Sequence, residues 1–411
     1  MSLSHRLARM TGRDTNESHR AATPLELLFD LTFVIAFSQA GSQAAHLLEL
    51  GHVGTGVLGF AISMFAVTWA WINYSWLASA YDNDDLFFRL ATLVQMIGVL
   101  VMALGFPQFF HSLDEGRYVD NSIMIAGYVV MRCSTIALWL RAAKHDPSRR
   151  STTLTYAVWL SIVQVGWLVV LVAHQSTPVA LALMTLLVVA EMLGPWIAER
   201  KGQTPWHAHH IAERYGLLVI ITLGEVLLGT ILAISAVVEA EGWSVQAVLV
   251  AFGGTVLAFG MWWSYFVLPS GSILHRHRGR AFFWGYGHIV LLAAIAGVGA
   301  GLHVAANVLS DEAHVDAVFA LLCVAIPLLV FELTLFTIYS VLVREFDPFH
   351  LWLLLGALVV LASSIVVALL GGSIGASIVG LAMSPVVVVV GYALIGHRHE
   401  EEVLRRNGAL P

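Results

Sequence analysis

Ionisable residues stand inside several long apolar stretches of this chain. Glu26 and Asp30 are one helical turn apart in "TPLELLFDLTFVIAF" (23–37), and Glu225 lies in the middle of "ITLGEVLLG" (221–229). A charged side chain at the centre of a bilayer costs about 2.5–3.5 kcal/mol on insertion scales. We therefore expect each of these residues to be a helix cap, one half of a charge pair, or a group that handles an ion or a proton.

Helix capping explains Glu26 most directly. The stretch "TPLE" (23–26) has the spacing of a capping box, in which the Glu26 carboxylate accepts the amide of the capping threonine. Glu213 follows His210 at the same spacing, so the pattern predicts a second, poorer cap there, with Arg214 next to it. A gating role is the alternative for Glu26, Glu213 and Arg214.

Asp30 lies a turn too deep to be a cap and has no basic residue four positions further on. We expect it to face the bundle interior or a water-filled cavity, as a binding or permeation group. A salt bridge to Arg214 or Arg89 is the alternative. Asn73 stands among aromatic residues, and its amide is predicted to bond to Asp30 or Asp82.

Glu225 is also too far from a helix start to be a cap. It is either a protonated carboxyl bonded to a neighbour or a group that handles an ion or a proton. Gly224 and Gly229 flank it and are expected to let neighbouring backbones approach closely.

Arg132 requires an anion close by, because an arginine does not shed its proton in a protein. Two carboxylates in apolar runs are candidates, Glu332 and Glu191. The pair would either lock parts of the bundle together or take part in anion binding or gating.

The histidine-rich stretch "HAHHIAER" (207–214) is a weak metal candidate. His209 and Glu213 are four residues apart and His210 is adjacent, but no HExxH motif or second carboxylate accompanies them. The sequence therefore predicts no metal site and no cofactor, and a pH-sensitive charge at a helix start instead. The acidic loop 82–85 is expected to be solvated, with attraction of cations as the alternative.

The elements that carry these residues are membrane helices. Of the 411 residues, 58% are hydrophobic and 12% charged, against about a quarter charged in soluble domains. Twelve apolar stretches approach the length of about 20 residues that spans a bilayer. They are 25–48, 55–79, 87–109, 121–142, 154–174, 179–198, 212–237, 245–268, 281–306, 316–342, 351–370 and 375–396.

The basic residues predict the orientation of these spans. Of the 21 lysines and arginines, all but Arg117 and Arg132 fall in segments on one side, which the positive-inside rule makes cytoplasmic, with both termini. Aromatic residues gather at the ends of the second and eighth spans, as in an interfacial belt. They are Trp69, Trp71, Tyr74, Trp76, Tyr81, Trp262, Trp263 and Tyr265.

The chain also repeats itself. The stretch 71–106 corresponds to 262–302, and "RAAKHDPSRR" (141–150) to "VREFDPFHLW" (343–352). Each half has six spans, so the two halves are parallel repeats, a design that often places a binding site between halves. The sequence predicts a cytoplasmic N-terminal segment (1–24), a first repeat (25–198), a cytoplasmic linker (199–211), a second repeat (212–396) and a cytoplasmic tail (397–411).

Three of these stretches resemble a known family. "PLELLFDLTFVIAFSQ" (24–39), "YDNDD" (81–85) and "HHIAERYGLLVIITLGEVLLG" (209–229) look like the bacterial low-temperature-requirement A (LtrA) family, over nearly the whole chain. That family is named after a cold-growth phenotype, so the resemblance implies no reaction.

A second, fainter resemblance suggests a mechanism. "LELLFDLTFVIA" (25–36) and "WIN" (71–73) are similar to motifs of the endolysosomal-type potassium channels, which implies a shared fold of six-helix repeats with a pore-lining first helix. Leu28, Phe29 and Leu217 depart from the channel pattern, so potassium conductance does not follow.

The sequence therefore predicts an all-α, multi-pass protein of the cell membrane that is a channel or transporter for a cation, a proton or a small solute, with buried carboxylates on the path. A membrane-embedded enzyme acting on a lipid or apolar substrate, or a membrane-stress or structural protein, is the alternative. The expected partners are the lipid bilayer and the small solute or ion, with no nucleic acid; a homo-oligomer is left open.

Overall fold

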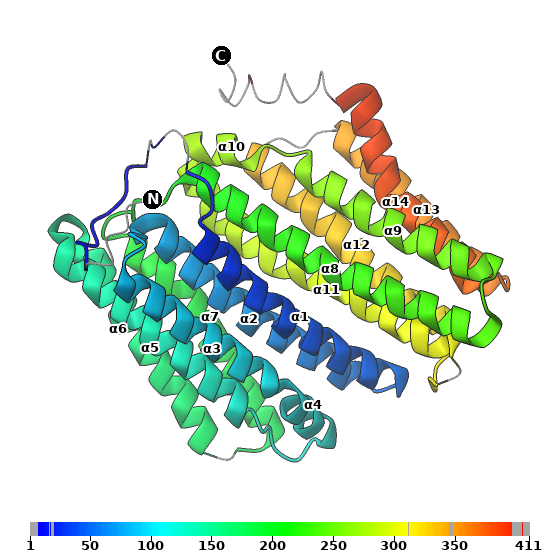
Figure 1. Ribbon diagram of the computed structural model, residues 1–411, viewed down its shortest axis with the longest axis horizontal. Coiled ribbons are helices and arrows are strands. Elements are labelled where there is room, and N and C mark those ends of the chain that lie inside the picture. Colours follow the sequence, from blue (N-terminus) through cyan, green and yellow to red (C-terminus); the bar gives the residue numbers. More distant parts are fainter. Residues whose placement is uncertain are drawn as a thin grey trace. The chain divides into compact units, whose positions relative to one another are not determined.

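The computed structural model describes residues 7–15, 17, 20–173, 175–310, 312–344, 348–396 and 405 (Figure 1). Within these residues twelve helical segments are long and apolar enough to cross a membrane, which confirms the predicted number of spans. Of the predicted tail 397–411, all but Arg405 lies outside the described residues, as do residues 1–6 of the N-terminal segment.

The helices follow one another with short connections. They are α1 (Pro24–Glu49), α2 (Val53–Tyr81), α3 (Leu86–Leu104), α4 (Phe106–Glu115), α5 (Ser122–His145), η1 (Pro147–Arg149), α6 (Arg150–Val172), α7 (Thr177–Glu199), α8 (Ala208–Glu241), α9 (Val245–Phe266), α10 (Ser270–Arg276), η2 (Arg278–Arg280), α11 (Ala281–Leu309), α12 (Ala317–Val343), α13 (Pro348–Leu369), α14 (Ile374–Gly391) and η3 (Tyr392–Gly396).

The chain forms two compact units that do not coincide with a simple cut in the sequence. The first comprises Met1–Ala40 and Ala66–Arg214, and the second comprises Gly41–Phe65 and Tyr215–Pro411. Helices α1, α2 and α8 therefore each contribute residues to both units. The two-repeat organisation and the cytoplasmic location of the termini stay predictions.

Each unit has its own succession of helix contacts. In the first unit α3 packs on α5, α5 on α6, and α6 on α7. In the second unit α11 packs on α12, α12 on α13, and α13 on α14, which also lies along α9 (Figure 1). The third to sixth spans thus follow the same order of contacts as the ninth to twelfth.

Side-chain caps fix where several helices begin. Asp85 accepts the amide of Phe88 at the start of α3 (3.0 Å), and Asp316 accepts the amide of Phe319 at the start of α12 (2.8 Å). Such caps satisfy amides that the first turn of a helix leaves unpaired, which matters most at the edge of a membrane.

Candidate functional site

The start of α1 is a capping box, as predicted. The Thr23 amide donates to Glu26 Oε2 (2.8 Å), and the Glu26 amide donates to Thr23 Oγ1 (3.2 Å). Pro24 occupies the first helical position, where its missing N–H is not needed. Glu26 is therefore held at the third position of α1 with its carboxylate turned back toward the helix start.

Helix α8 has a different cap from the one that the sequence predicted. The helix begins at Ala208 rather than 212, because the His207 ring caps it: Nδ1 accepts the His210 amide (3.2 Å). Glu213 lies in the second turn and is exposed, so its predicted capping role is wrong. His210 consequently holds the third position of α8, as Glu26 does on α1, and Arg214 lies four residues later, as Asp30 does.

These matching positions meet in a cluster of four ionisable residues, Glu26, Asp30, His210 and Arg214, which we call the α1–α8 charge cluster. Arg214 donates from Nη2 and Nε to Asp30 (2.5 and 3.2 Å) and places Nη1 2.8 Å from Glu26 Oε1. His210 Nε2 lies 3.2 Å from Glu26 Oε2. All four residues have 0% exposure.

The structure thereby decides between the alternatives for Asp30. Its partner is Arg214, whereas Arg89 pairs with Asp84 (2.7 Å). Trp71 completes the shell of Asp30 by donating from Nε1 (2.7 Å). A fully buried carboxylate held by a bidentate arginine and an indole N–H is satisfied as an anion.

Formal charge does not balance in the α1–α8 charge cluster. Two carboxylates face a single guanidinium, and His210 Nδ1 has no hydrogen-bond partner among the described residues. With a neutral imidazole the cluster carries one excess negative charge in a site closed to water. Burial of a net charge is unfavourable, so the cluster favours one additional proton.

The surroundings of the cluster do not supply the missing charge. Arg20 donates to the carbonyl oxygens of Ala78 (2.8 Å) and Ser79, and Asp82 lies near it, so they add one charge of each sign. His207 Nε2 lies 2.8 Å from the backbone oxygen of Glu17. Burial and the neighbouring Glu26 carboxylate raise the pKa of Asp82 to about 6.

The acidic loop 82–85 is only partly solvated, contrary to the prediction. Asp82 and Asp85 are each 3% exposed, and only Asp84 is exposed. Burial alone would raise the pKa of Asp85, but hydrogen bonds from Arg141 and from the Phe88 and Ala8 amides lower it to about 2. Asp85 is thus a structural anion.

A second buried charge pair joins α5 to α7. Arg132 Nη2 donates to Glu191 Oε2 (2.8 Å), and both side chains are 2% exposed, so Glu191 rather than Glu332 is the partner of Arg132. Glu191 also accepts from three neutral donors, which are Tyr128 (2.9 Å), Trp69 (2.9 Å) and Trp167 (3.3 Å).

We call these five residues the Glu191 network. The four donors come from α2, α5 and α6, and Glu191 comes from α7. Because every donor converges on one carboxylate, the network joins four helices of the first unit. The sequence predicted an interfacial belt for Trp69 and Trp71, but both are 0% exposed, and they serve as indole donors to buried carboxylates.

The remaining candidates lie apart from these clusters. Glu332 Oε1 lies 2.6 Å from Ser384 Oγ in the second unit. Glu225 is 7% exposed and lies where α8 crosses α11. Asn73 Nδ2 donates to the Trp69 carbonyl oxygen in its own helix (2.8 Å), so the predicted bond to Asp30 or Asp82 is wrong.

The histidines of the weak metal candidate separate onto different surfaces of α8. His209 is exposed, whereas His210 is fully buried against Glu26. Within the described part of the chain, no group of three or more His, Cys, Asp and Glu side chains is arranged to hold a metal ion.

Comparison with known proteins agrees with the membrane architecture. Residues 21–389 match the family described as bacterial low temperature requirement A protein (LtrA). The chain is also similar to an uncharacterized protein of Rhizobium meliloti (strain 1021), with 28% identity over 263 residues. That match covers 62% of this chain and 60% of the relative, less than two thirds of its length. Because the family match spans nearly the whole chain, this multi-pass membrane protein belongs to the bacterial LtrA family.

Proposed function

We propose that this protein moves protons across the cell membrane and that the α1–α8 charge cluster is a proton-binding site on the path. The observation that carries the proposal is the unbalanced charge: two fully buried carboxylates share one arginine, next to an imidazole nitrogen without a partner among the described residues. Ionisable residues inside membrane proteins commonly mark ion pathways and proton relays.

His210 is the residue that takes up and releases the proton. Its Nε2 faces Glu26, and its Nδ1 offers a lone pair that nothing in the described structure occupies. A proton on Nδ1 makes the cluster neutral, and loss of that proton restores the excess negative charge. Unperturbed imidazole changes charge near pH 6.5, so a histidine suits a cycle of this kind under physiological conditions.

Asp30 and Arg214 have a different part in this proposal. Their bidentate contact is complete, so Arg214 stays charged and keeps Asp30 ionised. The pair sets a fixed field, while Glu26 and His210 share the mobile proton. The cluster lies at the ends of α1 and α8 that the distribution of basic residues predicts to be cytoplasmic, so it would exchange protons with that side.

Proton flux into proteoliposomes tests the proposal directly. The purified protein is reconstituted with a pH-sensitive dye inside, and a potassium gradient with valinomycin sets the membrane potential. We expect proton flux above that of empty liposomes. In His210→Gln we expect a loss of about 100-fold or more, because a positioned proton-transfer group contributes about 10²–10⁴-fold.

His209→Gln is the matched control, because this neighbouring histidine is exposed and outside the cluster. Its flux should equal that of the native protein. Equal losses in the two variants would contradict the role of His210. No proton flux by folded protein would overturn the proposed function itself.

A further inference from the structure

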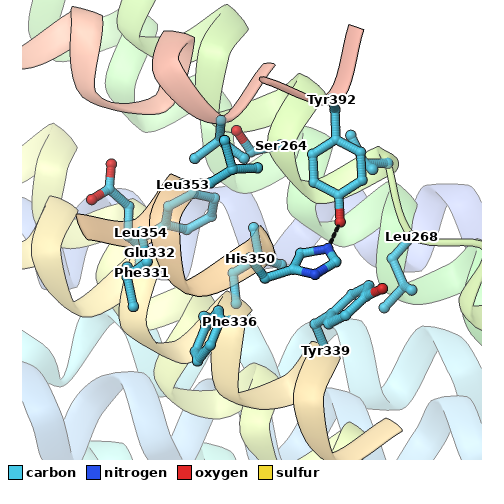
Figure 2. Close-up of a pocket in the computed structure, with 13 residues that line it drawn as sticks. Ser264, Leu268, Phe331, Glu332, Phe336, Tyr339, His350, Leu353, Leu354 and Tyr392 are labelled. Carbon is cyan, nitrogen blue, oxygen red and sulfur yellow. Dashed lines mark hydrogen bonds between the residues drawn. The ribbon is translucent and has the colours of Figure 1, made fainter. Parts of the chain in front are cut away.

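The second unit contains a cavity of about 60 Å³ between α9, α12, α13 and α14 (Figure 2). One water needs about 10–15 Å³ by this measure, so the cavity has room for roughly four to six heavy atoms. Its wall is mostly apolar and aromatic, with Phe331, Phe336, Tyr339 and Tyr392 among the lining residues. Among the described residues, Glu332 is the one acidic side chain that lines it.

The periodicity of α12 places Glu332 toward the end of this cavity that is farther from Val343. Lining residues recur along one face of α12 from Phe331 to Tyr339, toward the end of the helix at Val343. Glu332 precedes Val343 by 11 residues, which is about 17 Å of helix. Figure 2 shows Glu332 on one side of the cavity and the hydrogen-bonded His350 and Tyr392 on the other.

The hydrogen bonds of Ser384 indicate that the Glu332 carboxyl carries a proton in this geometry. Ser384 Oγ lies 2.6 Å from Glu332 Oε1 and 2.8 Å from the Ala357 carbonyl oxygen. A hydroxyl has one hydrogen and cannot donate fully to both acceptors. If the carboxyl donates to Ser384 Oγ and the hydroxyl donates to Ala357, both short contacts become hydrogen bonds.

Glu332 is nevertheless suited to hold a cation. It is 5% exposed, and its Oε2 has no hydrogen-bond partner among the described residues. In the part of the chain that the structure describes, no lysine or arginine lines the cavity. Aromatic rings attract a cation placed over their faces. The wall therefore complements a small ligand with one positive charge and a short apolar body.

We propose that this cavity binds a primary alkylammonium ion, whose charged group takes the place of the proton on Glu332. In this step the O–H bond of the carboxyl breaks, the ammonium N–H donates to the resulting carboxylate, and one proton leaves to water for each ammonium bound. The site belongs to the second unit alone and does not require proton movement through the α1–α8 charge cluster. The ammonium group could belong to a free amine or to the ethanolamine headgroup of a phospholipid.

Calorimetric titration of the purified protein in detergent with n-butylammonium tests the proposal. In two buffers with different ionisation enthalpies, we expect release of close to one proton per ammonium bound, a result that needs no variant. 1-Butanol has the same heavy-atom count without the charge, and we expect it to bind at least tenfold more weakly. Absence of n-butylammonium binding, or equal binding of 1-butanol, would overturn the proposal.

Glu332→Gln removes the ionisable group and keeps the shape of the side chain, so it should lower the affinity for n-butylammonium at least tenfold and abolish proton release. Glu239→Gln is the matched control, because Glu239 is exposed on α8, and it should bind as the native protein does. Retained binding in Glu332→Gln would contradict the assignment. In nanodiscs, weaker n-butylammonium binding with phosphatidylethanolamine than with phosphatidylcholine would identify the headgroup as the source, and equal binding a free amine.

Discussion

Replacing Arg214 with methionine should destabilise the protein strongly. Arg214 has 0% exposure and is the cation that contacts both Asp30 (2.5 Å) and Glu26 (2.8 Å) in the cluster. Breaking a buried charge pair by removing one partner costs about 3–5 kcal/mol, because the other charge stays buried without compensation. We expect Arg214→Met to lower the free energy of unfolding by this amount, measured by titration with sodium dodecyl sulfate in mixed micelles and circular dichroism.

A double-mutant cycle separates the charge pair from simple loss of packing. Asp30→Asn removes one of the two carboxylates that Arg214 compensates, so Arg214→Met should cost at least about 1 kcal/mol less in the Asp30→Asn background, within the usual range of coupling between contacting residues. Arg276→Met is the control, since Arg276 is exposed and should change stability by less than about 0.5 kcal/mol. Additive effects of Asp30→Asn and Arg214→Met, within about 0.5 kcal/mol, would refute the reasoning.

Two further predictions concern other buried carboxylates. The pKa of Asp82 is raised from 3.8 to about 6, so its ionisation opposes folding above about pH 6 and has no effect below about pH 4. Asp82→Asn should therefore stabilise the protein at pH 8. The gain should be up to about 3 kcal/mol, at 1.36 kcal/mol per pKa unit. Thermal unfolding at pH 8 and pH 4 measures this, and an equal gain at both pH values would contradict it. Glu191→Gln should destabilise the protein by about 3–5 kcal/mol, because Arg132 loses its counterion, yet leave proton flux per folded molecule unchanged in the proteoliposome assay. A loss of flux without a loss of stability would contradict the structural role of the Glu191 network.

The membrane helices could be predicted from the sequence because hydropathy and length are sufficient for that purpose. The twelve apolar stretches correspond to the twelve observed spans, and the ends differ by a few residues. Helix α6 begins at Arg150 instead of 154, and α8 also begins a full turn early, at Ala208 instead of 212. Hydropathy misses this turn because it contains His209 and His210, and His207 is not among the residues usually considered as caps.

The partners of the buried charges could be narrowed down but not chosen. An arginine in a span requires an anion, and that rule produced Glu191 and Glu332 as candidates for Arg132. Choosing between them requires the packing of α5 on α6 and of α6 on α7, since Arg132 and Glu191 are 59 residues apart in the chain. Asp30 and Arg214 are 184 residues apart, and only the register of α8 brings them together.

The tryptophan donors were missed for a related reason. Trp69 and Trp71 were grouped with the aromatic residues at the end of α2, where such residues often mark the membrane interface, but they lie 12 and 10 residues before that end. Two residues apart on a helix, they face different directions, and each indole N–H meets a different carboxylate, Glu191 or Asp30. The sequence did contain an indication of these hydrogen bonds, because a buried indole N–H and a buried carboxylate each require a partner.

A glycine in the sequence does not by itself identify a close contact between helices, and the two glycines that flank Glu225 allow a matched test of this. Both were expected to allow close approach, but a Cβ at Gly229 would lie 2.6 Å from the Gly299 carbonyl oxygen on α11, whereas a Cβ at Gly224 would meet nothing within 4 Å. Gly229→Ala should therefore cost about 1–3 kcal/mol through overpacking. Gly224→Ala should be neutral or stabilising by up to about 1 kcal/mol, because alanine favours the helix. Since the two positions are five residues apart in α8, unfolding of both variants in the same micelles compares them directly, and equal changes in stability would show that the α8–α11 crossing does not depend on Gly229.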